Sequence, residues 1–191
     1  LSSGAVTELP FADCDGSMTW ANDSQTLFFA ELDETHRPHK LWRHTLGETA
    51  AHEVFHEPDG RFFLHCYRSS SERQLILLLN SKTTSESWVL DADHPQQAFN
   101  CLAPRVEGHD YSVDHGLYEE QWAWFIRTNQ DGINFALCYA LGDVPTRNEW
   151  QLLIAHNPGV MLEGLSLNAH ALCLSLREGG LPIIEVRPRG L

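Results

Sequence analysis

Short apolar segments separated by turn-forming residues run along the whole chain, and this pattern constrains the fold more than any other feature of the sequence. The segments span five to seven residues and are rich in aromatic, leucine and β-branched side chains, as in Thr26–Leu32, Gln74–Leu79 and Ala171–Leu176. Turn signals such as Pro58-Asp59-Gly60 and Asn157-Pro158-Gly159 lie between them. No stretch keeps a helical period for three turns, so the pattern predicts an all-β fold.

The predicted strands also repeat, with a period of about 46 to 49 residues that is close to the length of a four-stranded propeller blade. Similar strands recur at Lys40–Arg43, Glu86–Val89, Asn134–Leu137 and Leu181–Ile184. Each period divides into four strands, except that the last one has three. We therefore predict a partial or four-bladed β-propeller built of four-stranded antiparallel blades. The predicted blades are residues 17–57, 62–103, 109–155 and 161–187.

Two arrangements are open for the ends of the predicted propeller. Residues 5–11 precede the first blade and are predicted to form the outer strand of a preceding or closing blade. They would close a four-bladed ring by pairing with Leu181–Arg187, or the slice would stay an open arc that associates with a copy of itself. The chain lacks an initiator Met and begins with the turn-like Leu1-Ser2-Ser3-Gly4. We therefore expect it to be part of a longer protein.

The composition argues against several classes of function. A net charge of -13 opposes binding to nucleic acid or to an anionic membrane surface. No apolar run reaches the roughly 18 residues that a membrane span needs. The five cysteines form no C-x-x-C pair, so we expect reduced thiols in a cytoplasmic protein, with no metal site and no cofactor. These cysteines are Cys14, Cys66, Cys101, Cys138 and Cys173.

Several segments carry a resemblance to a known family when they are taken together and in order. They are Trp20–Ser24, Arg37–His44, Thr83–Glu86, Asp110–His115, Arg127–Asn129, Asp131–Phe135 and Met161–Gly164. With these segments the chain resembles the N-terminal propeller of the oligopeptidase B (protease II) group within the prolyl oligopeptidase family of serine peptidases. The resemblance covers most of the chain, and no single segment carries it alone.

The resemblance implies a two-domain serine peptidase in which a seven-bladed propeller caps an α/β-hydrolase domain and limits entry to short peptides, which are cleaved after Lys or Arg. The implied partners are that hydrolase domain and short basic peptides. The Ser, Asp and His triad belongs to the hydrolase domain, and none of its motifs is present in this sequence. The resemblance therefore implies no catalytic residue here. An independent propeller that serves as a protein-interaction module is the alternative function.

The segment His52–His56 matches H-E-x-x-H, the pattern with which a helix of a metalloprotease binds zinc. Its central Val-Phe pair and a nearby proline favour a strand instead. On a strand the two histidines lie about 13 Å apart, too far to share one zinc ion. We predict solvent-facing histidines on an outer strand. A surface loop entering a strand is predicted for His36, His39 and His44.

Two further segments imitate a serine hydrolase. Gly164–Asn168 is one residue short of the G-x-S-x-G elbow and lacks its strand-to-helix context. Ser112, Asp114 and His115 include the residue types of a triad, but neighbours on one strand point to alternate faces of the sheet. We interpret both segments as ordinary strands.

One candidate binding surface follows from the predicted blades. The first strand of each blade lines the central channel of a propeller, and the predicted first strands carry Asp110, Asp114 and Glu163. These carboxylates would form an acidic channel lining that favours basic peptides. The alternative is that they pair with neighbouring residues or face the solvent at the rims.

Overall fold

The computed structural model describes residues 13–168 and 170–188, which form four antiparallel β-sheets. Three sheets have four strands and the last has three, and within these ranges the only helical element is the short 3-10 turn η1 (Arg147–Glu149). The first sheet holds β1 (Cys14–Trp20), β2 (Thr26–Leu32), β3 (Pro38–Thr45) and β4 (His52–His56). The second holds β5 (Phe63–Arg68), β6 (Gln74–Asn80), β7 (Ser85–Asp91) and β8 (Asn100–Ala103). The third holds β9 (Tyr111–Tyr118), β10 (Gln121–Thr128), β11 (Ala136–Leu141) and β12 (Gln151–Ile154), and the fourth holds β13 (Val160–Leu167), β14 (Ala171–Glu178) and β15 (Leu181–Pro188).

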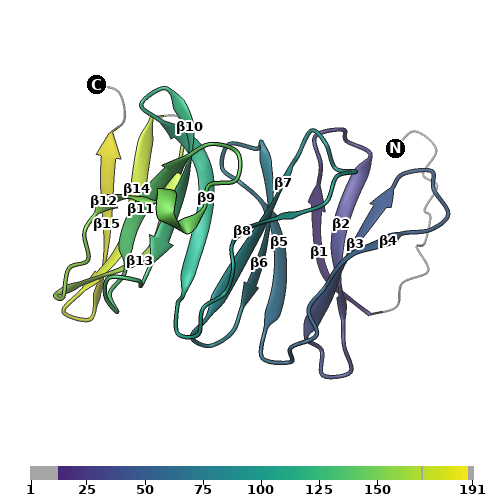
Figure 1. Cartoon of the computed structure of the whole chain (residues 1–191), viewed down its shortest axis with the longest axis horizontal. Coiled ribbons are helices and arrows are strands. Elements are labelled where there is room, and N and C mark those ends of the chain that lie inside the picture. The colour runs from purple at the N-terminus through teal and green to yellow at the C-terminus, as the bar shows by residue number, and fades with distance from the viewer. Residues whose placement is uncertain (1–12, 169, 189–191) are drawn as a thin grey trace.

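The sheets stand side by side in chain order, with the first at one end of the row and the fourth at the other (Figure 1). Strands follow one another across each sheet, so every connection within a sheet is a hairpin. Among the described residues the sheets form an open row and do not close into a ring (Figure 1). The partial propeller is therefore confirmed as the fold, and this part of the chain forms no four-bladed ring. The proposed closing strand, residues 5–11, lies outside the described residues.

The second strands of the first three sheets, β2, β6 and β10, bury most of their apolar residues. Of these, β6 and β10 belong to sheets that lie between two neighbouring sheets (Figure 1). β6 reads Gln-Leu-Ile-Leu-Leu-Leu-Asn, a continuous apolar run that buries both faces of the strand. Its alternate residues enter different cores: Leu75 and Leu77 pack toward the first sheet, and Ile76 packs toward the third. Full burial of one such side chain stabilises the fold by about 1.5–3 kcal/mol. Apolar packing between faces thus holds the row of sheets together.

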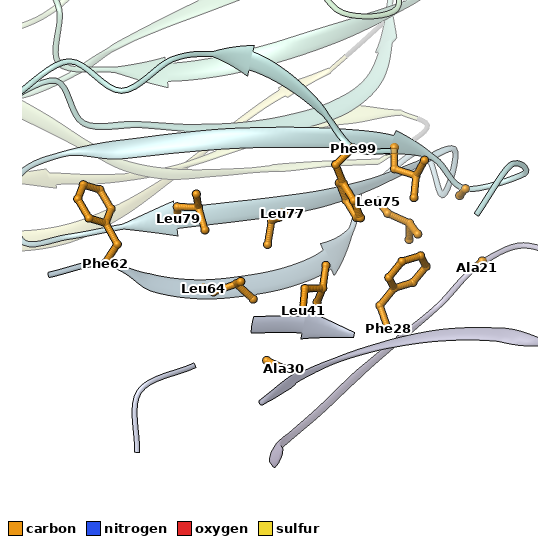
Figure 2. Close-up of a cluster of buried hydrophobic side chains, with 12 residues drawn as sticks. Ala21, Phe28, Ala30, Leu41, Phe62, Leu64, Leu75, Leu77, Leu79 and Phe99 are labelled. Atoms are coloured by element: carbon orange, nitrogen blue, oxygen red, sulfur yellow. The ribbon is translucent and has the colours of Figure 1, made fainter. Parts of the chain in front are cut away.

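Figure 2 shows the core between the first and second sheets. Phe28 and Leu41 extend from the first sheet toward Leu64 and Leu77 of the second (Figure 2). The ring of Phe28 also makes an edge contact with Phe99 at 5.8 Å between centroids. This core brings together residues far apart in the sequence, so the two sheets form one packed body.

The third and fourth strands of the three complete sheets share an irregularity. The register between them shifts at Leu41/Trp42, at Ser87/Trp88 and at Leu137/Cys138. A bulge bends an outer strand and increases its twist. Its recurrence at the same point of each sheet shows that the sequence repeat is a structural repeat.

The third sheet differs in detail from the prediction. We predicted a strand from Asn134, but β11 begins at Ala136. Phe135 has a φ of 64°, a left-handed conformation that no strand residue adopts. The similar stretch found at Asn134–Leu137 is therefore a turn followed by the start of a strand.

Candidate functional site

The first strands of consecutive sheets contact one another along one side of the row. Thr19 Oγ1 of β1 donates a hydrogen bond of 2.9 Å to Cys66 O of β5. Tyr67 Oη of β5 donates one of 3.1 Å to Val113 O of β9. These bonds join neighbouring sheets through their first strands, which is where a propeller has its channel-facing strands. The candidate carboxylates lie in or beside these strands.

Asp114 lies in β9 and connects the third sheet to the second. Its carboxylate accepts hydrogen bonds from Ser70 N at 2.8 Å and from the Ser70 hydroxyl group. It also accepts one from His115 N at 2.8 Å. Ser70 belongs to the turn between β5 and β6, so this carboxylate fixes a turn at the rim of the row.

Glu163 lies on β13 and forms an ion pair within its own sheet. Its Oε1 lies 2.5 Å from Nε of Arg177 on the neighbouring β14. The hydrogen bond and the charge of Glu163 raise the pKa of Arg177. Both side chains are partly exposed, so the pair is a surface ion pair of modest strength.

Asp110 precedes β9 and is held by Asn129. Its N–H donates to Asn129 Oδ1 at 2.9 Å, and Asn129 N donates to Asp110 O at 3.1 Å. The charges of Asp110 and Glu163 both act on the guanidinium of Arg127, at the junction of the third and fourth sheets. The structure therefore brings these two carboxylates near one cation, while Asp114 is bound to Ser70.

Arg127 is the residue of this region that the sequence analysis missed. Its Nε donates to Leu162 O at 2.7 Å, and its Cζ lies 3.3 Å from the ring centroid of Phe135. Burial lowers the pKa of Arg127, and the carboxylates of Asp110 and Glu163 oppose that shift. No local motif marks the position, because Leu162 is 35 residues away in the sequence.

A serine–histidine pair lies at the rim between the second and third sheets. Ser71 Oγ is 2.7 Å from His115 Nδ1, and burial of the ring lowers the pKa of His115 to about 4. The imidazole packs against Trp122 and Trp124, with centroids 5.7 and 4.8 Å away. In a catalytic triad the serine faces Nε2 and the carboxylate faces Nδ1. Here the serine occupies Nδ1, so the pair does not have triad geometry.

Most residues of the two histidine-rich segments lie on strands. His52 and His56 begin and end β4, so the H-E-x-x-H sequence is extended, as predicted. For the other group the expected surface loop is only partly right. His36 lies in a turn with a φ of 62°, but His39 and His44 belong to β3. The His44 ring is buried, with Nδ1 3.1 Å from Ala50 O.

Repeated antiparallel sheets joined through their first strands define this protein as a β-propeller. Residues 1–190 match the family model described as prolyl oligopeptidase, N-terminal β-propeller domain, and the chain belongs to this family. In the described residues, no helix is long and apolar enough to cross a membrane.

The chain is also similar to individual members of this family, both in sequence and in structure. It is 31% identical over 171 residues to dipeptidyl aminopeptidase BI of Pseudoxanthomonas mexicana, covering 87% of this chain and 23% of that protein. It is also 31% identical over 174 residues to protease 2 of Moraxella lacunata, covering 90% of this chain and 24% of that protein. It resembles the closed form of Trypanosoma brucei oligopeptidase B with covalently bound antipain, with a TM-score of 0.84, 25% identity, and coverage of 93% of this chain and 25% of that one. The chain spans about a quarter of the length of these relatives.

Proposed function

We propose that this chain is the non-catalytic propeller portion of an oligopeptidase B-like serine peptidase that cleaves short peptides after Lys or Arg. In this proposal an α/β-hydrolase domain elsewhere in the parent protein carries the catalytic triad, and the propeller restricts access to it. The observation that carries the proposal is the match of residues 1–190 to the propeller of this peptidase family. The likeness to proteins named protease 2 and oligopeptidase B supports the choice of group within the family.

The candidate carboxylates give the propeller a part in the choice of substrate. We assign Asp110, Asp114 and Glu163 to a surface that attracts basic peptides toward the inner side of the propeller, in keeping with the net charge of -13. Arg177 offsets much of the charge of Glu163, and Arg127 offsets part of the charge of Asp110. The attraction therefore rests chiefly on Asp114, whose partner Ser70 is neutral.

Free cysteines support a cytoplasmic location for the parent protein. All five thiols are unpaired, and they lie on several different sheets. Burial raises the pKa of Cys66 to about 12, which keeps this thiol protonated and unreactive at neutral pH. A reducing compartment suits such a set of thiols.

The test is the cleavage preference of the full-length protein. Reporter peptides that differ only in the residue before the scissile bond, Arg, Lys, Pro or Ala, are compared by kcat/KM. We expect Arg and Lys peptides to be cleaved and a serine-directed inhibitor to abolish that activity. Preference for Pro, removal of dipeptides from free N-termini in place of cleavage after Lys or Arg, or absence of peptidase activity would each refute the proposal.

A further inference from the structure

An open pocket lies at the rim of the row, where the second, third and fourth sheets meet. Its lining includes Ser70 and Ser71 of the β5–β6 turn, Gly116 and Trp122 of β9 and β10, and Leu167 and Asn168 at the end of β13. Trp122 is 42% exposed and Asn168 is also exposed, so solvent reaches the lining. Because β9 and β13 are first strands, the pocket lies beside the channel-facing strands of the propeller.

The lining of this pocket is mostly apolar. The Trp122 ring stacks on His115 with centroids 5.7 Å apart, and Arg73 Cζ lies 4.9 Å from the Trp122 centroid. Burial lowers the pKa of His115 to about 4, so that ring is neutral at neutral pH. The hydroxyl group of Ser71 is already engaged with His115 Nδ1. The pocket therefore suits an apolar occupant.

The size of the pocket limits what it can hold. Leu167 forms one wall and packs against the bare backbone of Gly116, where a Cβ atom would lie 2.9 Å from Leu167 Cδ1, closer than the roughly 3.5–4.0 Å at which carbon atoms pack. The cavity measures about 180 Å³. Pockets for whole small-molecule ligands measure about 300–1,000 Å³. This pocket therefore fits one side chain of a larger ligand.

The carboxylate of Asp114 lies directly beside the pocket. Ser70, which lines the pocket, donates to this carboxylate from its N–H at 2.8 Å and from its hydroxyl group. Asp114 also precedes Gly116 by two positions on β9, a separation of about 7 Å along a strand. Its hydrogen-bond partners, Ser70 and the N–H of His115, carry no charge, so the carboxylate keeps its negative charge.

The surroundings of the pocket add to this negative charge. Glu119 and Glu120 form the exposed turn between β9 and β10, next to Trp122 in the sequence. Arg73, the cation that stacks on Trp122, interacts electrostatically with Asp91. A cationic group on a ligand is therefore attracted to this part of the rim.

We infer that this pocket is a subsite on the propeller for one apolar side chain of a short basic peptide, with a nearby Lys or Arg of that peptide reaching Asp114. The apolar side chain covers Trp122 and Leu167, and the cation complements the carboxylate beside Ser70. The inference rests on the proposed function, because the occupant is a substrate of the proposed peptidase.

The test is the binding of short peptides to the full-length protein, measured by calorimetry without cleavage. Each probe contains one Arg followed by a reduced bond that cannot be hydrolysed, with Leu at one of the other positions in turn and Ala at the rest. We expect one Leu probe to bind about tenfold or more tightly than the all-Ala probe, because it buries an apolar side chain. Trp122→Ala should remove that difference. The matched control Trp20→Ala changes another exposed tryptophan, on β1, and should preserve it.

The charge of Asp114 is tested by exchanging the cation on the probe. Asp114→Asn should weaken binding of the best Leu probe and should leave unchanged the binding of the same probe with uncharged citrulline in place of Arg. The control Asp131→Asn removes an exposed carboxylate from the turn between β10 and β11 and should affect neither probe. Equal weakening of both probes by Asp114→Asn would overturn the contact between Asp114 and the cation.

Cross-linking distinguishes failure of this inference from failure of the proposed function. With a photoreactive diazirine in place of the Leu side chain, the best probe should cross-link to residues 116–122 or 167–168. A cross-link elsewhere, or no gain from Leu at any position, overturns the subsite and leaves the proposed function to the cleavage test. A cross-link at these residues in a protein that does not cleave after Lys or Arg refutes the proposed function alone. If Trp122→Ala does not fold, the cross-link in the natural protein still decides.

Discussion

Buried ionisable side chains join one sheet to the next, and most of their partners are distant in the sequence. Arg105 lies 2.5 Å from Glu57 and 3.2 Å from Glu86, connecting the first sheet to the second. Glu57 precedes Arg105 by 48 residues. The sequence analysis singled out neither Arg105 nor Arg127 as a connecting residue. Their carboxylate and carbonyl partners come near only when the sheets pack together. The three candidate carboxylates were accessible to prediction because they lie in or beside the repeating first strands.

His115 is expected to make the stability of the protein depend on pH. Burial, assisted by the charge of Arg73 and opposed by that of Asp143, lowers the pKa of His115 to about 4, against about 6.5 in the unfolded chain. The neutral ring is the buried form, so its contribution is complete above pH 6.5 and is lost as the pH falls toward 4. The full loss amounts to about 3 kcal/mol.

Chemical unfolding of the natural protein at several pH values between 7 and 4 checks this expectation. In His115→Gln the fall in unfolding free energy over this range should be smaller. The control is His65→Gln, which changes an exposed histidine on β5. An unchanged pH dependence in His115→Gln would show that the buried imidazole is not the group responsible.

At the scale of strands, prediction succeeded where the apolar pattern was long and the turns were clear. The segment predicted at Thr26–Leu32 has the bounds of β2, and the one predicted at Gln74–Leu79 ends one residue before β6 does. The strand predicted from Asn134 begins two residues later, at Ala136, because Phe135 has a left-handed φ of 64°. The bulges between the third and fourth strands carry no turn residue that would mark them in the sequence. Each bulge adds one residue to the fourth strand, and this shift depends on how two strands pair and not on a residue type in either strand.

The edge strand β15 is expected to make the 191-residue chain associate with itself in isolation. Leu181 is 70% exposed and Ile184 is 67% exposed on a strand that pairs only with β14 among the described residues. Bare apolar edges pair with other chains, and a charge on such a strand prevents this.

Light scattering should give a multiple of the chain mass, and Ile184→Lys should shift it toward the monomer. The control Ile133→Lys, at a position 83% exposed between β10 and β11, should leave the mass unchanged. A monomeric natural chain would contradict the expectation.

At the scale of the whole molecule, the repeat in the sequence predicted the propeller architecture, and the match to a family model showed the family. The open row of four sheets (Figure 1) corresponds to about a quarter of the length of the relatives that the chain matches. A stand-alone interaction module and an access-restricting propeller share this fold, so the fold alone does not separate them. The two functions predict different behaviour of the full-length protein, because only an access-restricting propeller makes cleavage depend on the length of the substrate.

The dependence of cleavage on substrate length tests the central claim most directly. The full-length protein is given one Arg-containing cleavage sequence in two forms, a peptide of about ten residues and an unfolded polypeptide of more than a hundred residues. If the propeller restricts access, kcat/KM for the long substrate should fall by at least about a hundredfold, and cleaving that substrate first with another peptidase should restore activity. Equal kcat/KM values for both forms would contradict the account.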